Sequence, residues 1–285
     1  MSATGAPAFA ELGVTSNFSF LHGGSHPHEF VGMAEHLKLS AIAIADRNTM
    51  AGVVRAHVAA KKHGIRLVVG ARLVLRDGFE ALCFPTDREA YGRLTKLLTK
   101  GNRRADKGEC HLDFKDLADL QRGQRFVVMP SYELDAGFRA KLARFAEAFP
   151  GETYLALTPY HRSNDRARFD ALAALAEEHG TPLLATNDAL YHDHGRRPLQ
   201  DILTCIREHV TIDEAGFRLE RNAERHLKGP SEMARLLSGY EDALARTMEI
   251  VEDCTFSLSE LKPHYPDEPT GQSATPQAEL ERLTW

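Results

Sequence analysis

Short apolar runs alternate with amphipathic segments over roughly the first two thirds of the chain. The runs are short, apolar at consecutive positions and bounded by polar turns, which is typical of strands in a parallel sheet covered on both faces. We therefore predict buried strands at residues 41–45, 67–69, 81–84, 126–129, 154–157 and 183–185.

Between these runs, apolar residues recur at helical spacing. One helix is predicted from Phe30 to Leu37, after a polar opening that contains a proline, and a second runs from Met50 to near Gly64. His57 falls on the apolar stripe of the second helix, so we predict that it packs in the core. Further helices are predicted around 138–145 and 169–175. Repeated strand–helix units favour an α/β fold, and their number favours a barrel over a small open sheet.

The last part of the chain has a different pattern. It is mostly helical from Arg196 to Cys254, without a strand signal. Prolines and polar residues without periodicity then indicate an extended connector, although the final residues resemble the start of a helix. We predict three parts: a barrel core at 1–195, a helical part at 196–260 that packs on it, and a connector at 261–285.

The charge of the chain argues against a broad nucleic-acid interface. The formal net charge is −5, whereas phosphate contacts, which supply most of the affinity for nucleic acid, need a basic surface. A local contact remains possible in the densest basic run, which contains Lys100, Arg103, Arg104 and Lys107. The simpler interpretation of this run is a solvated helix end and loop.

Composition also bears on the compartment. No run of about 18 apolar residues is present, and the first residues lack the pattern of a secretory signal. The 4 cysteines are far apart in sequence, without a CxxC pair. These features predict a cytoplasmic protein without membrane contact, and they argue against a disulfide framework or a zinc knuckle.

Three stretches, at 11–27, 43–53 and 185–192, resemble the PHP (polymerase and histidinol phosphatase) domain of C-family bacterial DNA polymerases. Their spacing from the Gly-Ala-Arg-Leu element at 70–73 fits as well, so the resemblance covers nearly the whole chain. Within that family, the Ser-Asn-Phe-Ser-Phe-Leu start, the Gly-Ala-Arg-Leu element and two later stretches are similar to the error-prone, damage-inducible branch. Those later stretches lie at 107–110 and 203–209.

The resemblance implies a distorted (β/α)7 TIM-like barrel with a metal site at the carboxyl ends of its strands. For a full-length parent, it implies an Mg²⁺-dependent DNA polymerase that carries out translesion synthesis on DNA in the cytoplasm. It also implies mutasome accessory proteins and a sliding clamp as partners. We expect the polymerase core to lie beyond Trp285, so that this domain contacts the core of its own chain.

Active members of the family hold two or three metal ions with histidines and carboxylates, because adjacent cations stabilise both oxygens of a phosphoryl transfer. The matching positions here are Gly13, Thr15, Asp46, Arg47, Arg72, Asp188 and Leu190. Only the two aspartates keep a ligand type. A firmly held transition metal needs roughly four ligands, and a guanidinium offers no lone pair. We predict an inactive site, without catalytic residues or a cofactor in this part of the protein.

Several alternatives remain open from the sequence. One hypothesis is that Arg47 or Arg72 supplies Asp46 and Asp188 with the positive charge that a metal gives in active members. A rival function is a residual metal-dependent phosphoesterase or 3′–5′ exonuclease that uses the two aspartates and nearby histidines. Another is a binding module without a polymerase attached. Adventitious metal could also bind near His161, His192 or His194.

Overall fold

The strands of this computed structural model form two sheets. The structure describes residues 6–120, 122–261, 270, 271 and 273–285. The first sheet is parallel, in the order β1–β2–β3. The second has five strands in the order β4–β5–β6–β7–β8. Their bounds are β1 (Ala10–Val14), β2 (Ala41–Ile44), β3 (Arg66–Val69), β4 (Ala71–Val74), β5 (Glu80–Pro85), β6 (Gln124–Met129), β7 (Thr153–Leu157) and β8 (Leu183–Ala185).

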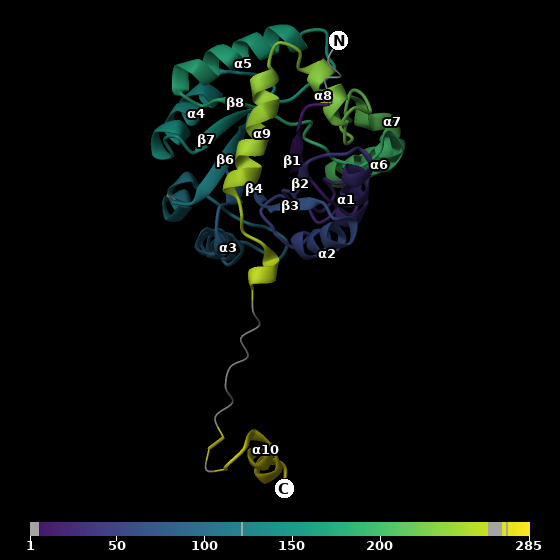
Figure 1. Cartoon of the computed structure of the whole chain (residues 1–285). Helices are drawn as coiled ribbons and strands as arrows, with labels where there is room; N and C mark the ends of the chain where they lie inside the picture. Colours follow the sequence, from purple (N-terminus) through teal and green to yellow (C-terminus); the bar gives the residue numbers. More distant parts are fainter. Residues whose placement is uncertain (1–5, 121, 262–269, 272) are drawn as a thin grey trace.

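Helices follow most strands in the first part of the chain, as the sequence pattern predicts. They are α1 (Pro27–His36), α2 (Val53–His63), α3 (Arg88–Asn102), α4 (Ala136–Ala148) and α5 (Asp165–His179). The later part is mostly helical, with α6 (Arg197–Glu208), α7 (Ile212–Ala215), α8 (Pro230–Leu236), α9 (Glu241–Asp253) and α10 (Pro276–Thr284). Short 3-10 turns occur at Phe114–Leu120, His194–Arg196, Gly216–Arg218 and Leu258–Glu260. Figure 1 shows α9 lying across the strands.

The α/β class is confirmed, but the predicted closed (β/α)7 barrel is not present in the described residues. β5 pairs antiparallel with both β4 and β6, so it is not the parallel strand that the sequence pattern suggested. The reason is the short connection from β4 to β5, which turns at Gly78 with a φ of 80°. A loop of that length can join only antiparallel neighbours, because a parallel crossover needs about a dozen residues or more.

The two sheets meet through a backbone bridge between Arg47 and Arg72. The N–H of Arg72 donates to the carbonyl of Asp46 at 2.9 Å, and the N–H of Asn48 donates to the carbonyl of Arg72 at 2.8 Å. On another side, the N–H of Thr15 donates to the carbonyl of Ala189 at 2.9 Å. The segments that follow β1, β2, β3 and β8 therefore converge at one end of the sheets.

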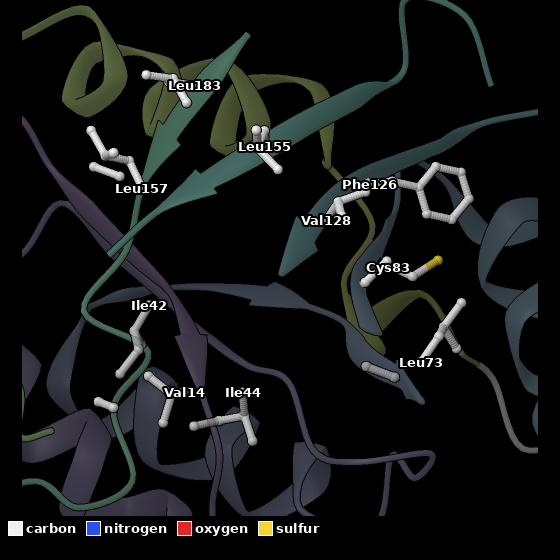
Figure 2. Close-up of a cluster of buried hydrophobic side chains, with 14 of the residues drawn as sticks. Val14, Ile42, Ile44, Leu73, Cys83, Phe126, Val128, Leu155, Leu157 and Leu183 are labelled. Carbon is white, nitrogen blue, oxygen red and sulfur yellow. The ribbon is translucent and has the colours of Figure 1, made fainter. Parts of the chain in front are cut away.

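Both faces of the strands are buried, as the apolar runs predict. Alternate residues enter different clusters: Ile42 and Ile44 face one core, and Ala41 and Ala43 face the other. Figure 2 shows the first cluster, with side chains from both sheets that include Val14, Leu73, Phe126, Val128 and Leu155. The second cluster is closed by Ile250 and Cys254, from α9 and the residue that follows it.

The apolar face of α2 differs from its predicted position. Val54 is 62% exposed, and the stripe that packs in the core is formed by Val53, Ala56 and Ala59. His57 is half-buried and contacts Ser259, so the prediction of a core histidine is wrong. The buried stripe of α2 thus follows its alanines together with Val53, and it lies on a different face from the one predicted through Val54 and His57.

The helical later part packs against the sheets through α9, which contacts β8 and β1. The boundaries at 195 and 260 remain predictions. Of the predicted connector, residues 262–269 and 272 lie outside the described residues. α10 covers the final residues, where the sequence resembles the start of a helix. Within the described ranges, no helix combines the length and the apolar character that a membrane crossing requires.

Candidate functional site

The converging strand ends bring together most of the positions selected from the sequence. Thr15 follows β1, Asp46 and Arg47 follow β2, Arg72 lies in β4 just after β3, and Asp188 follows β8. All are buried except Arg47, which is half-buried. Elements far apart in sequence thus contribute to a single polar cluster, held by the backbone hydrogen bonds described above.

Asp188 is neutralised by two arginines. Arg72 donates to Oδ1 of Asp188, and Arg225 donates to Oδ2 at 2.7 Å. Nε of Arg225 also donates to the backbone carbonyl of Asp188 at 2.6 Å. Burial alone would raise the pKa of Asp188, but the charges of Arg225 and Arg72 outweigh it and hold the pKa below its ordinary value. Asp188 is therefore a carboxylate saturated by guanidinium groups.

Glu80 forms the second acidic element of the site. Nη1 of Arg47 lies 2.8 Å from Oε1 of Glu80, and Nη1 of Arg72 lies 3.2 Å from Oε2 of Glu80. Arg72 thus bridges Asp188 and Glu80, and it is only 5% exposed. Burial opposes the charge on Arg72, but the two carboxylates outweigh this effect and keep its pKa above the ordinary value. Arg47 and Arg72 both direct their side chains into the protein rather than into bulk solvent.

Asp46 has a different environment from Asp188. Its carboxylate accepts hydrogen bonds from the N–H and Oγ of Ser16, both at 2.8 Å, and from Oγ of Ser19 at 2.7 Å. Burial is the main effect on its pKa, which is raised despite these donors. Arg72 donates to Asp188 and acts on Asp46 through its charge, which agrees with the hypothesis that an arginine supplies positive charge to the two aspartates. That this charge replaces a metal stays a hypothesis.

Position 13 has no space for a metal-ligating side chain. A Cβ on Gly13 would lie 2.3 Å from Oγ1 of Thr186. The same region holds Glu11, which is 1% exposed and accepts hydrogen bonds from the N–H groups of Gly13 and Asn187 at 2.8 and 2.7 Å. The buried Glu11 side chain and Thr186 therefore occupy the space next to position 13 that a metal-ligating side chain would need.

Leu190, the last of the seven positions, contributes backbone hydrogen bonds to the site. Its N–H donates to the carbonyl of Arg225 at 2.8 Å, and its carbonyl accepts from the N–H of Gly24 at 2.8 Å. Leu190 lines a cavity together with Thr15 and Arg72. An apolar side chain cannot coordinate a cation, so this position contributes packing and the placement of Arg225.

The residues present do not fit a bound metal cluster. Within residues 6–120, 122–261, 270–271 and 273–285, no group of three or more His, Cys, Asp or Glu side chains is placed to hold a metal ion. Asp46 accepts hydrogen bonds from serines, and Asp188 accepts hydrogen bonds from arginines. A cation that entered would have to displace Arg72 from Asp188 or stand beside its positive charge.

The four residues of the predicted nucleic-acid contact differ in their surroundings. Lys100 and Arg104 both pair with Asp116, at 3.0 and 2.5 Å. Arg103 lies beside them along a shallow hollow at the end of α3, whereas Lys107 lines a different hollow. Two of the four charges are thus used internally, and nucleic-acid contact through this run stays a prediction.

The three candidate histidines are also separated in their contacts. Nε2 of His161 lies 3.5 Å from Glu224, and Nδ1 of His192 lies 2.8 Å from Oγ of Ser25. His194 is exposed and lies 3.6 Å from its neighbour Asp193. His192 and His194 both lie close enough to Asp193 to act on it electrostatically, whereas His161 pairs with Glu224. Adventitious metal near any of the three histidines stays a prediction.

Sequence reasoning missed Arg225 and Glu80, the residues that complete the polar cluster. Arg225 comes from a loop of the helical later part, far along the chain from the strand ends. No spacing in the sequence connects these residues with the motif positions. An unusual density of arginine and glutamate at 218–225 is the one signal that could have drawn attention to this loop.

The site geometry defines an α/β domain whose strand-end cluster is built of arginine–carboxylate pairs. Residues 11–155 match the PHP domain family. The chain belongs to that family, which confirms the resemblance inferred from its motifs.

Among individual relatives, an error-prone DNA polymerase from Caulobacter vibrioides is 50% identical over 280 residues, covering 98% of this chain and 26% of the relative. Error-prone DNA polymerase 2 from Agrobacterium fabrum is 47% identical over 278 residues, covering 98% of this chain and 26% of the relative. The chain thus matches the N-terminal quarter of these polymerases at about 50% identity.

Among solved structures, an amidohydrolase from Chromobacterium violaceum aligns with a TM-score of 0.47 and 15% identity, covering 63% of this chain and 86% of that one. A lesion-specific endonuclease from Pyrococcus furiosus aligns with a TM-score of 0.46 and 11% identity, covering 64% of this chain and 48% of that one. Scores at this level support no inference about this chain.

Proposed function

We propose that this chain is the N-terminal PHP domain of an error-prone DNA polymerase that carries out translesion synthesis, and that the domain itself has no hydrolase activity. Its role in this proposal is structural: it braces the polymerase core of the same chain and offers a surface for other proteins. The identity with the N-terminal quarter of error-prone polymerases supports the first part. The arginine-filled strand-end cluster supports the second.

The observation that carries the second part is the pairing of Asp188 with Arg72 and Arg225. Two like unit charges about 4 Å apart at an effective dielectric of ~20 repel by roughly 4 kcal/mol. A divalent cation beside Arg72 would meet this repulsion for each of its charges. It would also lack nitrogen ligands from Gly13, Thr15 and Leu190, whose side chains have none.

In the full-length protein, we propose that DNA synthesis is Mg²⁺-dependent and depends on carboxylates outside the present chain. DNA, mutasome accessory proteins and a sliding clamp are the proposed partners, and the cytoplasm is the proposed compartment. These proposals rest on the named relatives, of which this chain spans about a quarter.

The test is a metal analysis combined with hydrolase assays on the purified chain. Metal content is measured by mass spectrometry after dialysis against chelator. Phosphomonoester and single-strand 3′–5′ hydrolysis is then measured with added Mn²⁺ or Zn²⁺. We expect well under one equivalent of metal and no turnover.

An Asp46→Ala variant is the control that separates intrinsic turnover from a contaminating hydrolase. Turnover that is present in the wild type and lost in Asp46→Ala, with two or more retained ions, would show a rebuilt metal site and refute the proposal. Turnover that is equal in both proteins would come from a contaminant and would leave the predicted inactivity standing.

A further inference from the structure

Helix α6 presents its apolar stripe to the outside of the protein. Leu199, Ile202 and Ile206 stand at positions i, i+3 and i+7, so they share one face of the helix. All three side chains are exposed, Ile202 and Ile206 by more than half of their surface. This arrangement is the reverse of an ordinary amphipathic helix, whose apolar stripe faces the core. The buried residues of α6 are instead Gln200, Thr204 and Cys205.

Hydrogen bonds from the inner face hold α6 in this orientation. Nε2 of Gln200 donates to the carbonyl of His22 at 2.8 Å, and Nη1 of Arg207 donates to the carbonyl of Leu21 at 2.8 Å. Arg197, the first residue of α6, donates to two backbone carbonyls of a later loop. A rotation that buried the apolar stripe would break these bonds and leave buried polar groups without partners. The fold therefore fixes the apolar stripe outward.

The exposed apolar surface continues from α6 to α7. Ile212 on α7 is more than half exposed, and it lines one shallow hollow together with Ile202, Ile206 and Val210. Phe217, in the turn after α7, is 97% exposed. A single exposed apolar residue needs no explanation, whereas a contiguous group from two helices indicates a contact surface. We call this group the α6–α7 face and define it as Leu199, Ile202, Ile206, Val210 and Ile212.

Helix α10 also exposes apolar side chains. Leu280 and Leu283 stand at positions i and i+3, and both are more than half exposed. The buried residue of this helix is the acidic Glu279. In the described part of the chain, two helices thus present apolar side chains to solvent, which favours additional protein as their cover.

We propose that the α6–α7 face is the surface on which the polymerase core of the same chain docks. This inference rests on the proposed function and deepens it, because it assigns the bracing contact to particular residues. The matched part makes up 26% of the relatives from Caulobacter vibrioides and Agrobacterium fabrum, so about three quarters of each relative lies outside it. Covalent linkage gives such a region a high effective concentration, so it competes favourably with separate molecules for the face.

Thiol labelling of a residue in the face is the primary experiment. Ile212→Cys is introduced into the 285-residue chain and into the proposed full-length protein, and its reaction with a maleimide is followed by peptide mass spectrometry. We expect labelling to be at least about tenfold slower in the full-length protein, because the core covers the thiol except during local opening. Val58→Cys on α2 is the matched control. Val58 is also apolar and is 64% exposed, so it should react at the same rate in both proteins.

A second substitution tests the apolar character of the contact. Ile206→Glu places a charge in the face, and Val58→Glu places one on α2. Both wild-type side chains are exposed, so neither change should alter the thermal melting of the 285-residue chain. In the full-length protein, Ile206→Glu should restore rapid labelling of Ile212→Cys, because burial of an unpaired charge is unfavourable, and Val58→Glu should not. Ile206→Ala only removes apolar atoms and should give an intermediate rate.

Three results would overturn the proposal. The first is equal labelling of Ile212→Cys in the two proteins. The second is slow labelling already in the 285-residue chain, and a dimer in light scattering would then identify a second copy as the cover. The third is an equal effect of Val58→Glu and Ile206→Glu, since protection would then not depend on the α6–α7 face.

Primer extension by the full-length protein separates failure of this inference from failure of the proposed function. DNA synthesis without protection of Ile212→Cys would refute the docking surface and leave the polymerase assignment standing. Absence of DNA synthesis, or a gene without a polymerase region beyond residue 285, would refute the proposed function and this inference with it. DNA synthesis together with protection that Ile206→Glu abolishes would support both.

Discussion

The arginine–carboxylate cluster predicts a large and specific loss of stability on replacement of Arg72 by methionine. Methionine keeps an unbranched side chain of similar reach but removes the charge that bridges Asp188 and Glu80. Removal of one partner from a buried ion pair typically costs 3–5 kcal/mol, because the remaining charge is left buried without compensation. Asp188 retains Arg225, and Glu80 retains Arg47, so we expect the lower end, about 3 kcal/mol.

Urea denaturation followed by circular dichroism measures this change, and thermal melting should show a decrease of about 6–10 °C. Arg76→Met is the matched control. Arg76 pairs with Asp113 at 2.7 Å, but its side chain is 57% exposed. Exposed pairs contribute about 0–1 kcal/mol, so the control should lose less than about 1 kcal/mol.

The reasoning fails if Arg72→Met and Arg76→Met lose the same amount, because burial of the first pair would then have no energetic consequence. A double-mutant cycle with Asp188→Asn isolates the pairwise part. We expect a coupling free energy of about 2 kcal/mol, since the two residues share one network. A coupling near zero would locate the loss in packing around the new side chain rather than in the ion pair.

Three further predictions concern the charge state of Asp188, the packing at two glycines, and the ion pairs of Asp116. Because the pKa of Asp188 is lower in the folded than in the unfolded protein, its carboxylate stabilises the fold above the unfolded pKa of about 4, and this stabilisation is lost as the pH falls through the folded pKa. Asp188→Asn should therefore reduce the loss of stability at acid pH, measured by urea denaturation across pH. An unchanged dependence of stability on pH would contradict the charge assigned to Asp188. Gly70→Ala places a Cβ 2.4 Å from the ring of Phe84, so it should lower the free energy of unfolding by about 1–3 kcal/mol in chemical denaturation. Gly92→Ala on α3 is the control: its Cβ meets no atom within 4 Å, so it should raise the free energy of unfolding by up to about 1 kcal/mol. Similar changes in the two variants would refute the packing argument. Asp116→Asn removes the buried carboxylate that pairs with Lys100 and Arg104, so it should lower the free energy of unfolding by about 1–3 kcal/mol. Thermal melting measures the change. A stability equal to that of the wild type would mean that these ion pairs do not stabilise the fold.

The sequence alone determined the class of the fold and the family. Apolar runs mark buried strands wherever both faces of a sheet are covered, so the positions of six strands followed from local composition. The absence of ligand-type side chains at 13, 15, 47, 72 and 190 can also be read directly, because the chemistry of a side chain does not depend on its surroundings.

The tertiary structure decided how those residues are used. Arg72 bridges Asp188 and Glu80, while Asp46 accepts from serines, and no local pattern distinguishes these two outcomes. Arg225 reaches the cluster from a loop about 37 residues beyond Asp188, because folding returns the later helices to the strand ends. Strand direction was likewise set by tertiary pairing: an apolar strand can be parallel or antiparallel, and the short turn before β5 made it antiparallel.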